Sequence, residues 1–69
     1  MERICLEHRK DGNFEIIPLK SVNHIKVERD FLDGNGKYFD KWTVYLFEEE
    51  IEVEVDQEKS NQLIELLSI

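Results

Sequence analysis

Apolar and polar residues alternate in five short runs along this chain. The runs cover residues 3–9, 14–19, 24–31, 42–47 and 51–55, and most of them are separated by residues that favour turns. Alternation with a period of two places successive side chains on opposite faces of a strand. The pattern therefore predicts five β-strands, each with one apolar face.

Three short turns set the predicted register of the strands. Asp11-Gly12 and Asn35-Gly36 suit two-residue hairpin loops because their residues tolerate positive φ, and Glu48-Glu49 separates the last two runs. The apolar residues that these loops place opposite one another are Leu6 and Ile17, Ile4 and Leu19, Val27 and Val44, Ile25 and Leu46, Val44 and Val53, and Trp42 and Val55. The three turns independently give one continuous apolar face, which favours a β-meander.

Two further features refine the second and third strands. Pro18 has no backbone N–H, so its strand is predicted to lie at an edge or to end there. Residues 19–23 are expected to form a short turn with Val22 anchored in the core. In the next run, Phe31 is expected on the same apolar face as Ile25.

The last part of the chain changes to a helical pattern. Asp56 is a candidate N-cap, and the helix is predicted from about Gln57 to the C-terminus, with an apolar stripe formed by Leu63, Ile64, Leu66 and Leu67. The whole chain, residues 1–69, is therefore predicted to be one α+β domain: a five-stranded antiparallel β-meander with one C-terminal α-helix packed on one face. The alternative is a small SH3-like open barrel with the helix capping one end.

Composition restricts the classes of function. Cys5 is the single cysteine among 69 residues, so no internal disulfide is expected, and no Cys/His spacing suits a structural zinc site. The net charge of −7 disfavours direct binding to nucleic-acid phosphates or to an anionic membrane, because both require clustered Lys and Arg. The unpaired cysteine and the lack of an apolar N-terminal run indicate a cytoplasmic protein.

Residues suited to catalysis or cofactor binding are few. His8, His24 and Cys5 do not fall into a spacing typical of a catalytic or metal-binding site. Gly34-Asn35-Gly36 lies in a predicted hairpin, without a following helix that would bind a phosphate. We therefore expect no enzymatic activity, no catalytic or metal site and no cofactor. The histidines are interpreted as surface residues and Cys5 as a small apolar filler.

Glutamates are concentrated in and before the fifth run. Glu50, Glu52 and Glu54 alternate with apolar residues, so they are predicted to project together from the outer face of one strand. The same register directs aromatic side chains to that face. Their apolar area is larger than a solvated face needs. The candidate partner-binding residues are Tyr45, Phe47, Phe39, Leu32, Glu50, Glu52 and Glu54.

Two other interpretations of this outer face stay open. The glutamates could be a solvated row that protects an edge strand from aggregation. The sheet could also coil enough for Leu32 and Phe39 to fold into the core.

Three hypotheses of function follow. The first is a non-catalytic protein-binding module that docks through the aromatic and glutamate face on a partner with a basic surface. Its size and charge suit a phage or mobile-element inhibitor of a nucleic-acid enzyme, in which glutamates imitate phosphates. The second is a homo-oligomeric structural or regulatory protein that self-associates through the same face or an edge strand. The third is a small-ligand or cation sensor that uses the acidic strand and the two histidines.

Overall fold

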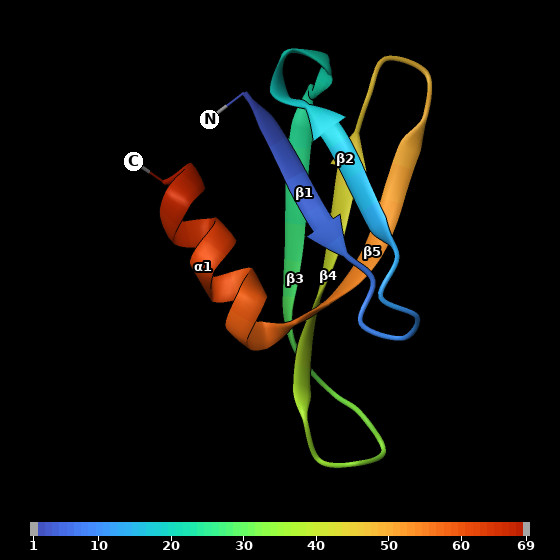
Figure 1. Cartoon of the computed structure of the whole chain (residues 1–69), viewed down its shortest axis with the longest axis vertical. Helices are drawn as coiled ribbons and strands as arrows, with labels where there is room; N and C mark the ends of the chain where they lie inside the picture. Colours follow the sequence, from blue (N-terminus) through green and yellow to red (C-terminus); the bar gives the residue numbers. More distant parts are fainter. Residues whose placement is uncertain (1, 69) are drawn as a thin grey trace.

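The computed structural model describes residues 2–68, which form five strands followed by one helix (Figure 1). The elements are β1 (Arg3–Glu7), β2 (Phe14–Pro18), β3 (His24–Leu32), β4 (Tyr38–Tyr45), β5 (Glu50–Asp56) and α1 (Gln57–Leu67). Every strand pair is antiparallel and joins strands that are consecutive in the chain. The predicted α+β class, with five antiparallel strands and a C-terminal helix, is confirmed.

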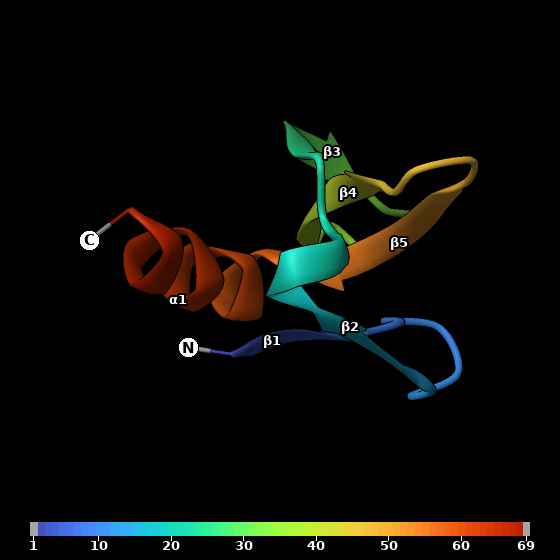
Figure 2. The ribbon, with the colours of Figure 1, turned by 90° about the horizontal axis from the view of Figure 1, so that it is seen from above.

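The five strands are divided between two sheets. Within the described residues, β1 pairs with β2, and β3, β4 and β5 form a second sheet. A single 3₁₀ turn, Leu19–Ser21, redirects the chain after Pro18, which is the last residue of β2 as its missing N–H predicts. Figure 2 shows the β1–β2 hairpin as a layer beside the three-stranded sheet, with α1 next to it. The strands of residues 2–68 do not close into a barrel.

The hydrophobic core lies between these layers. Its buried members are Ile4, Leu6, Ile17, Trp42, Val44, Val53 and Val55. Val22 and the apolar side chains of α1 pack against them, so the predicted anchor in the turn is confirmed. The hairpin and the helix thus cover the same apolar face of the three-stranded sheet. A two-stranded hairpin is marginally stable alone, so it depends on this contact.

Two hairpin loops differ from the predicted ones, and this changes the register. The β1–β2 loop contains four residues between the paired residues His8 and Asn13 instead of two. The β4–β5 loop contains two residues, Phe47 and Glu48, and begins one residue earlier than predicted. The strands therefore slide by two positions, and Ile4 rather than Leu6 lies opposite Ile17. A slide of two positions keeps every side chain on the same face. The predicted pairs are therefore wrong, whereas the predicted faces of these strands are right.

In the β3–β4 hairpin the register also shifts by two positions, one at the loop and one at a bulge. Its loop contains three residues, and the last, Gly36, has a φ of +78°, as in a type I turn followed by a glycine bulge. A β-bulge follows between Glu28 and Phe31, where Asp30 has a φ of +66°. Between the loop and the bulge, the side chains of β3 lie on the opposite face from the predicted one. Phe31 therefore faces outward, opposite Phe39, and its predicted place in the core is wrong.

A fully buried carboxylate, that of Asp40 on β4, holds the bulge. Arg29 Nε donates to Asp40 Oδ2 at 3.0 Å, and the backbone N–H of Asp30 donates to Oδ1 at 3.2 Å. From α1, Ser60 Oγ donates to Oδ2, and Gln57 Nε2 donates to Oδ1 at 3.2 Å. Burying a charge without hydrogen-bond partners costs several kcal/mol. This cost is comparable to the net free energy of unfolding of a small domain. These donors remove that cost.

The network around Asp40 connects elements that are distant in sequence. It joins the bulge of β3, the middle of β4 and the first turns of α1, and it reaches the core where Trp42 Nε1 donates to Ser60 Oγ at 2.8 Å. Burial raises the pKa of Asp40, but the hydrogen bonds from α1 and the bulge, with the charge of Arg29, outweigh burial and hold the pKa below its usual value. The anion therefore stabilises the fold above the unfolded-state pKa, and this contribution is lost as the pH falls through the folded-state pKa.

The helix begins at the predicted residue but is capped differently. Asp56 occupies the N-cap position, yet its side chain makes no capping hydrogen bond within the described residues. It accepts instead from Arg9 Nε at 3.1 Å. The stripe of α1 packs against the core except for Leu66, which is exposed. The predicted continuation of the helix to Ile69 lies outside the described residues.

Replacing Asp40 by Asn tests the network with little change of shape. The amide has no charge to pair with Arg29, and its NH₂ group faces donors, so we expect the free energy of unfolding to fall by about 2–4 kcal/mol. Urea denaturation at neutral pH measures this change. The control is Glu49→Gln, the same chemistry in an exposed loop, with an expected change below about 0.5 kcal/mol. Equally small effects of the two substitutions would contradict the account.

Candidate functional site

The three predicted glutamates of β5 project from the face of the sheet that is turned away from the core. Their cross-strand pairs are Glu50 with Tyr45, Glu52 with Thr43, and Glu54 with Lys41. Glu50 and Glu52 are exposed, whereas Glu54 is half-buried, with its Oε1 3.8 Å from Nζ of Lys10 in the β1–β2 loop. With the β4–β5 loop they form a surface that we call the acidic rim, which consists of Phe47, Glu48, Glu49, Glu50, Glu52 and Glu54.

Phe47 lies in the β4–β5 loop, not on the sheet as expected. Its side chain is 87% exposed, more than any other large hydrophobic residue in the described part of the chain. The loop is closed by a hydrogen bond from Leu46 N to Glu49 O at 2.8 Å, so the ring is held away from the core. Tyr45, at the end of β4, is half-buried and lies 5.6 Å from the ring of His24.

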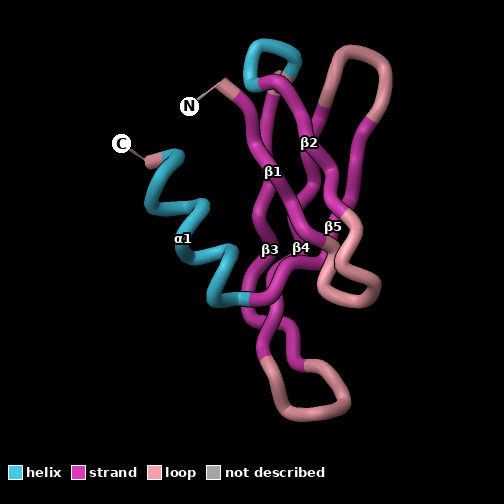
Figure 3. The backbone as a smooth tube through the Cα atoms, in the orientation of Figure 1, coloured by secondary structure: helices cyan, strands magenta, loops and turns pink. Residues whose placement is uncertain are grey.

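Leu32 lies at the other end of the three-stranded sheet. It is exposed and opposite Tyr38, which is also exposed, next to the β3–β4 loop, so it lies on the other face of the sheet from the one predicted. The β3–β4 and β4–β5 loops are at opposite ends of the molecule (Figures 1 and 3). The structure therefore does not bring Leu32 and Phe47 together into one patch.

Phe39 has the predicted direction but is not exposed. It is 9% exposed, because the guanidinium of Arg9 lies 4.6 Å from its ring centroid and the ring of Phe31 stacks beside it at 5.5 Å. The β1–β2 loop reaches this position across the edge of β5, where the N–H of Arg9 donates to the carbonyl of Glu54 at 2.9 Å. The expectation of an exposed Phe39 is therefore wrong.

Arg9 joins three parts of the fold that are far apart in the sequence. Its guanidinium donates to Asp56 at the start of α1 and to Asp33 in the β3–β4 loop. Asp33 also accepts from the backbone N–H groups of Asn35 and Lys37. The hydrogen bonds from Lys37 and Arg9 lower the pKa of Asp33. The sequence gives no signal for this contact, because Arg9 ends the first alternating run next to Lys10 and Asp11, and such charged segments are typical of surfaces.

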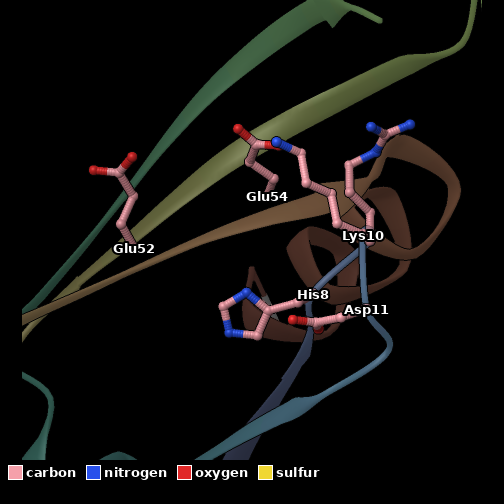
Figure 4. Close-up of a pocket in the computed structure, with 6 residues that line it drawn as sticks. His8, Lys10, Asp11, Glu52 and Glu54 are labelled. Atoms are coloured by element: carbon pink, nitrogen blue, oxygen red, sulfur yellow. The ribbon is translucent and has the colours of Figure 1, made fainter.

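A groove of about 210 Å³ separates the β1–β2 loop from the acidic rim. It is lined by His8, Arg9, Lys10, Asp11, Glu52 and Glu54. In Figure 4, Lys10 and Glu54 point toward one another, while Glu52 stands apart. His8 Nε2 lies 3.1 Å from Oε2 of Glu15. The lining of the groove therefore carries charges of both signs. Residues 2–68 contain no cluster of three or more His, Cys, Asp or Glu that is placed to hold a metal ion.

The remaining candidates lie apart from this groove or at its border. His24 is exposed on β3, and His8 is half-buried beside Glu15. Cys5 is exposed on β1, so its interpretation as an apolar filler is wrong. Among residues 2–68, no helix has the length and apolar character needed to cross a membrane.

Comparison with known proteins gives no match to this chain among protein-family models, curated proteins or solved structures. The function is therefore inferred from the residues and contacts of the chain itself.

Replacing Arg9 by Lys tests the contact that shields Phe39. Lysine keeps the charge but not the planar group that binds two carboxylates and covers the ring. We expect the melting temperature to fall by about 5 °C and amide hydrogen exchange to become faster in the β1–β2 loop. The matched control is Lys10→Arg in the same loop, with both properties unchanged. Unchanged exchange in the Arg9 variant would contradict the proposed contact.

Proposed function

We propose that this chain is a non-catalytic protein-binding module that docks on a basic partner through the acidic rim. The observation that carries the proposal is the position of Phe47, an exposed aromatic ring at one end of a series of glutamates. Aromatic side chains surrounded by polar groups are typical anchors of protein interfaces.

The distribution of charge supports a basic partner. Residues 47–58 contain no Lys or Arg, and they include seven of the sixteen acidic residues of the chain. A surface of one sign attracts an oppositely charged protein and orients it during the encounter. Protection of an exposed strand edge would explain the glutamates of β5, but it would not explain Phe47.

The three other apolar candidates contribute unequally to this proposal. Tyr45 lies opposite Glu50 and extends the acidic rim over β4. Leu32 lies at the far end of the sheet, and Phe39 is covered by Arg9, so the proposed contact does not include them.

The partner class that we propose is a groove that otherwise binds nucleic acid, as expected for a phage or mobile-element inhibitor. Glu50, Glu52 and Glu54 support this class because alternate residues of one strand place their carboxylates in a row, about 7 Å apart. Such a row meets a line of basic side chains as a phosphate backbone does. The cytoplasm, where nucleic-acid enzymes work, is the compartment that this proposal requires.

Affinity capture from source cells tests the proposal with four forms of the chain. The wild type and Tyr38→Ser, a control with an exposed aromatic residue at the far end, are expected to retain the same basic protein. Phe47→Ser and Glu52→Lys are expected to retain at least about tenfold less, since an interface anchor contributes about 2 kcal/mol or more. Quantitative mass spectrometry of the retained proteins measures this ratio.

The salt dependence of the captured complex gives a second check. Binding through the glutamates is expected to weaken as ionic strength rises from about 0.05 M to 0.5 M, since salt screens exposed charges. Equal retention by all four forms, or a retained partner with an acidic surface, would contradict the proposal.

A further inference from the structure

The outer surface of the β1–β2 hairpin carries exposed apolar side chains between charged ones, and Glu7 at its end pairs with Lys59 of α1. Two of its side chains, Phe14 and Ile16, are 58% and 63% exposed. We call this surface the hairpin face; it consists of Arg3, Cys5 and Glu7 from β1 and Phe14, Ile16 and Pro18 from β2. In Figure 2 the hairpin forms one side of the molecule, with the three-stranded sheet on its inner side.

Charge distinguishes the hairpin face from the rest of the molecule. Residues 1–21 contain four acidic and four basic residues, so this segment is neutral. Residues 22–69 contain twelve acidic and five basic residues and carry the entire net charge of −7. Two copies of the chain therefore repel one another through most orientations, and the hairpin side is where they meet with the least repulsion.

The order of residues on the hairpin face is complementary to itself. On β1, Arg3 and Glu7 lie at equal distances on either side of Cys5, and across the hairpin Ile16 lies opposite Cys5. A two-fold axis between two such faces, perpendicular to the strands at this row, places Arg3 of each copy over Glu7 of the other. Unlike charges thus meet twice, and Glu7, which also pairs with Lys59 of its own α1, then lies between two cations. The same operation stacks the exposed apolar side chains of the two β2 strands.

We propose that a second copy of this chain covers the hairpin face, forming a symmetric dimer in which Cys5 faces Cys5 and Ile16 faces Ile16 across the two-fold axis. The two hairpins pack as the facing sheets of a small sandwich, about 10 Å apart. Each hairpin is then covered on both sides, by its own three-stranded sheet and by the second hairpin. This surface is separate from the acidic rim, so the dimer leaves the proposed partner contact open.

The size of the hairpin face sets the expected strength of the dimer. Two strands of five residues cover roughly 17 Å by 10 Å. This is below the area of about 800 Å² per partner in a standard stable interface. The dimer is therefore expected to dissociate on dilution, with monomer dominant near about 10 µM and dimer dominant near about 1 mM.

Sedimentation equilibrium over this concentration range and crosslinking with a short bifunctional maleimide test the dimer. The wild type is expected to dimerise and to be crosslinked through Cys5, its single cysteine. Ile16→Glu is expected to remain monomeric and uncrosslinked. Leu66→Glu adds the same charge at a residue that is 53% exposed on α1, and it is expected to behave like the wild type. Circular dichroism confirms that each variant is folded.

Three outcomes would overturn the proposal. One is a wild-type chain that remains monomeric at about 1 mM. This result is also expected if the hairpin face binds a different protein, and it would overturn the dimer in that case too. Another is an Ile16→Glu variant that dimerises like the wild type. The third is a dimer without the Cys5 crosslink. Pairing of two β2 edges would give this last result, because it leaves the two Cys5 residues on the outer strands, about 14 Å apart.

A reversal of charge gives an independent check of the orientation. Arg3→Glu places a glutamate over Glu7 of the second copy and is expected to weaken the dimer at least about threefold. The triple variant Arg3→Glu, Glu7→Arg, Lys59→Gln restores unlike charges between the copies and removes the cation that pairs with Glu7 in the wild type, so it is expected to recover the affinity. A triple variant that dimerises more weakly than Arg3→Glu would show that the two copies are not arranged in this way.

Discussion

The buried carboxylate of Asp40 is the interaction on which the rest of this structure depends. It accepts hydrogen bonds from the bulge of β3 and from the first turns of α1, so it fixes the strand geometry and the position of the helix together. The bulge in turn decides which side chains of β3 face outward. Through this bulge, Phe31 leaves the core and stacks on Phe39, where Arg9 covers the pair from the β1–β2 loop.

Two surfaces of the molecule differ in charge and composition. The β1–β2 hairpin is neutral and apolar on its outer face, whereas β5 and the β4–β5 loop carry glutamates and one exposed aromatic ring. Arg9 fixes the hairpin loop to the other parts of the fold, since it binds both Asp33 and Asp56. The two surfaces are therefore held in a constant relation, as the two proposed contacts require.

Much of the fold followed from the alternation of residue types, because the face of a side chain depends only on whether its position along a strand is odd or even. In two hairpins the register was wrong by two residues, because the β1–β2 loop is longer and the β4–β5 loop begins one residue earlier, and this error leaves the faces of their strands unchanged. At the third hairpin the error came in two single steps, a three-residue loop and a bulge. The residues between them, including Phe31, were therefore placed on the wrong face.

Part of the polar network also had a signal in the sequence. Asp40 has the same position in the alternation as Trp42, and Arg29 has the same position as Val27, so two unlike charges fall at inward positions of neighbouring strands. Such a pair indicates a buried ion pair. The contacts of Arg9 had no such signal, since they link two loops and the start of α1, which come together only in the folded chain. The predicted aromatic patch is split because Leu32 and Phe47 lie beside loops at opposite ends of the sheet, and because Arg9 covers Phe39.

The pKa of Asp40 is the most direct test of this account, because the network requires a buried carboxylate that stays charged. Carbon-13 NMR of its side-chain carboxyl group, followed through an acid titration of the folded protein, measures that pKa. The account predicts a midpoint below the ordinary aspartate value of about 3.9. A midpoint at or above that value would show that burial outweighs the hydrogen bonds, and it would contradict the central role given to this residue.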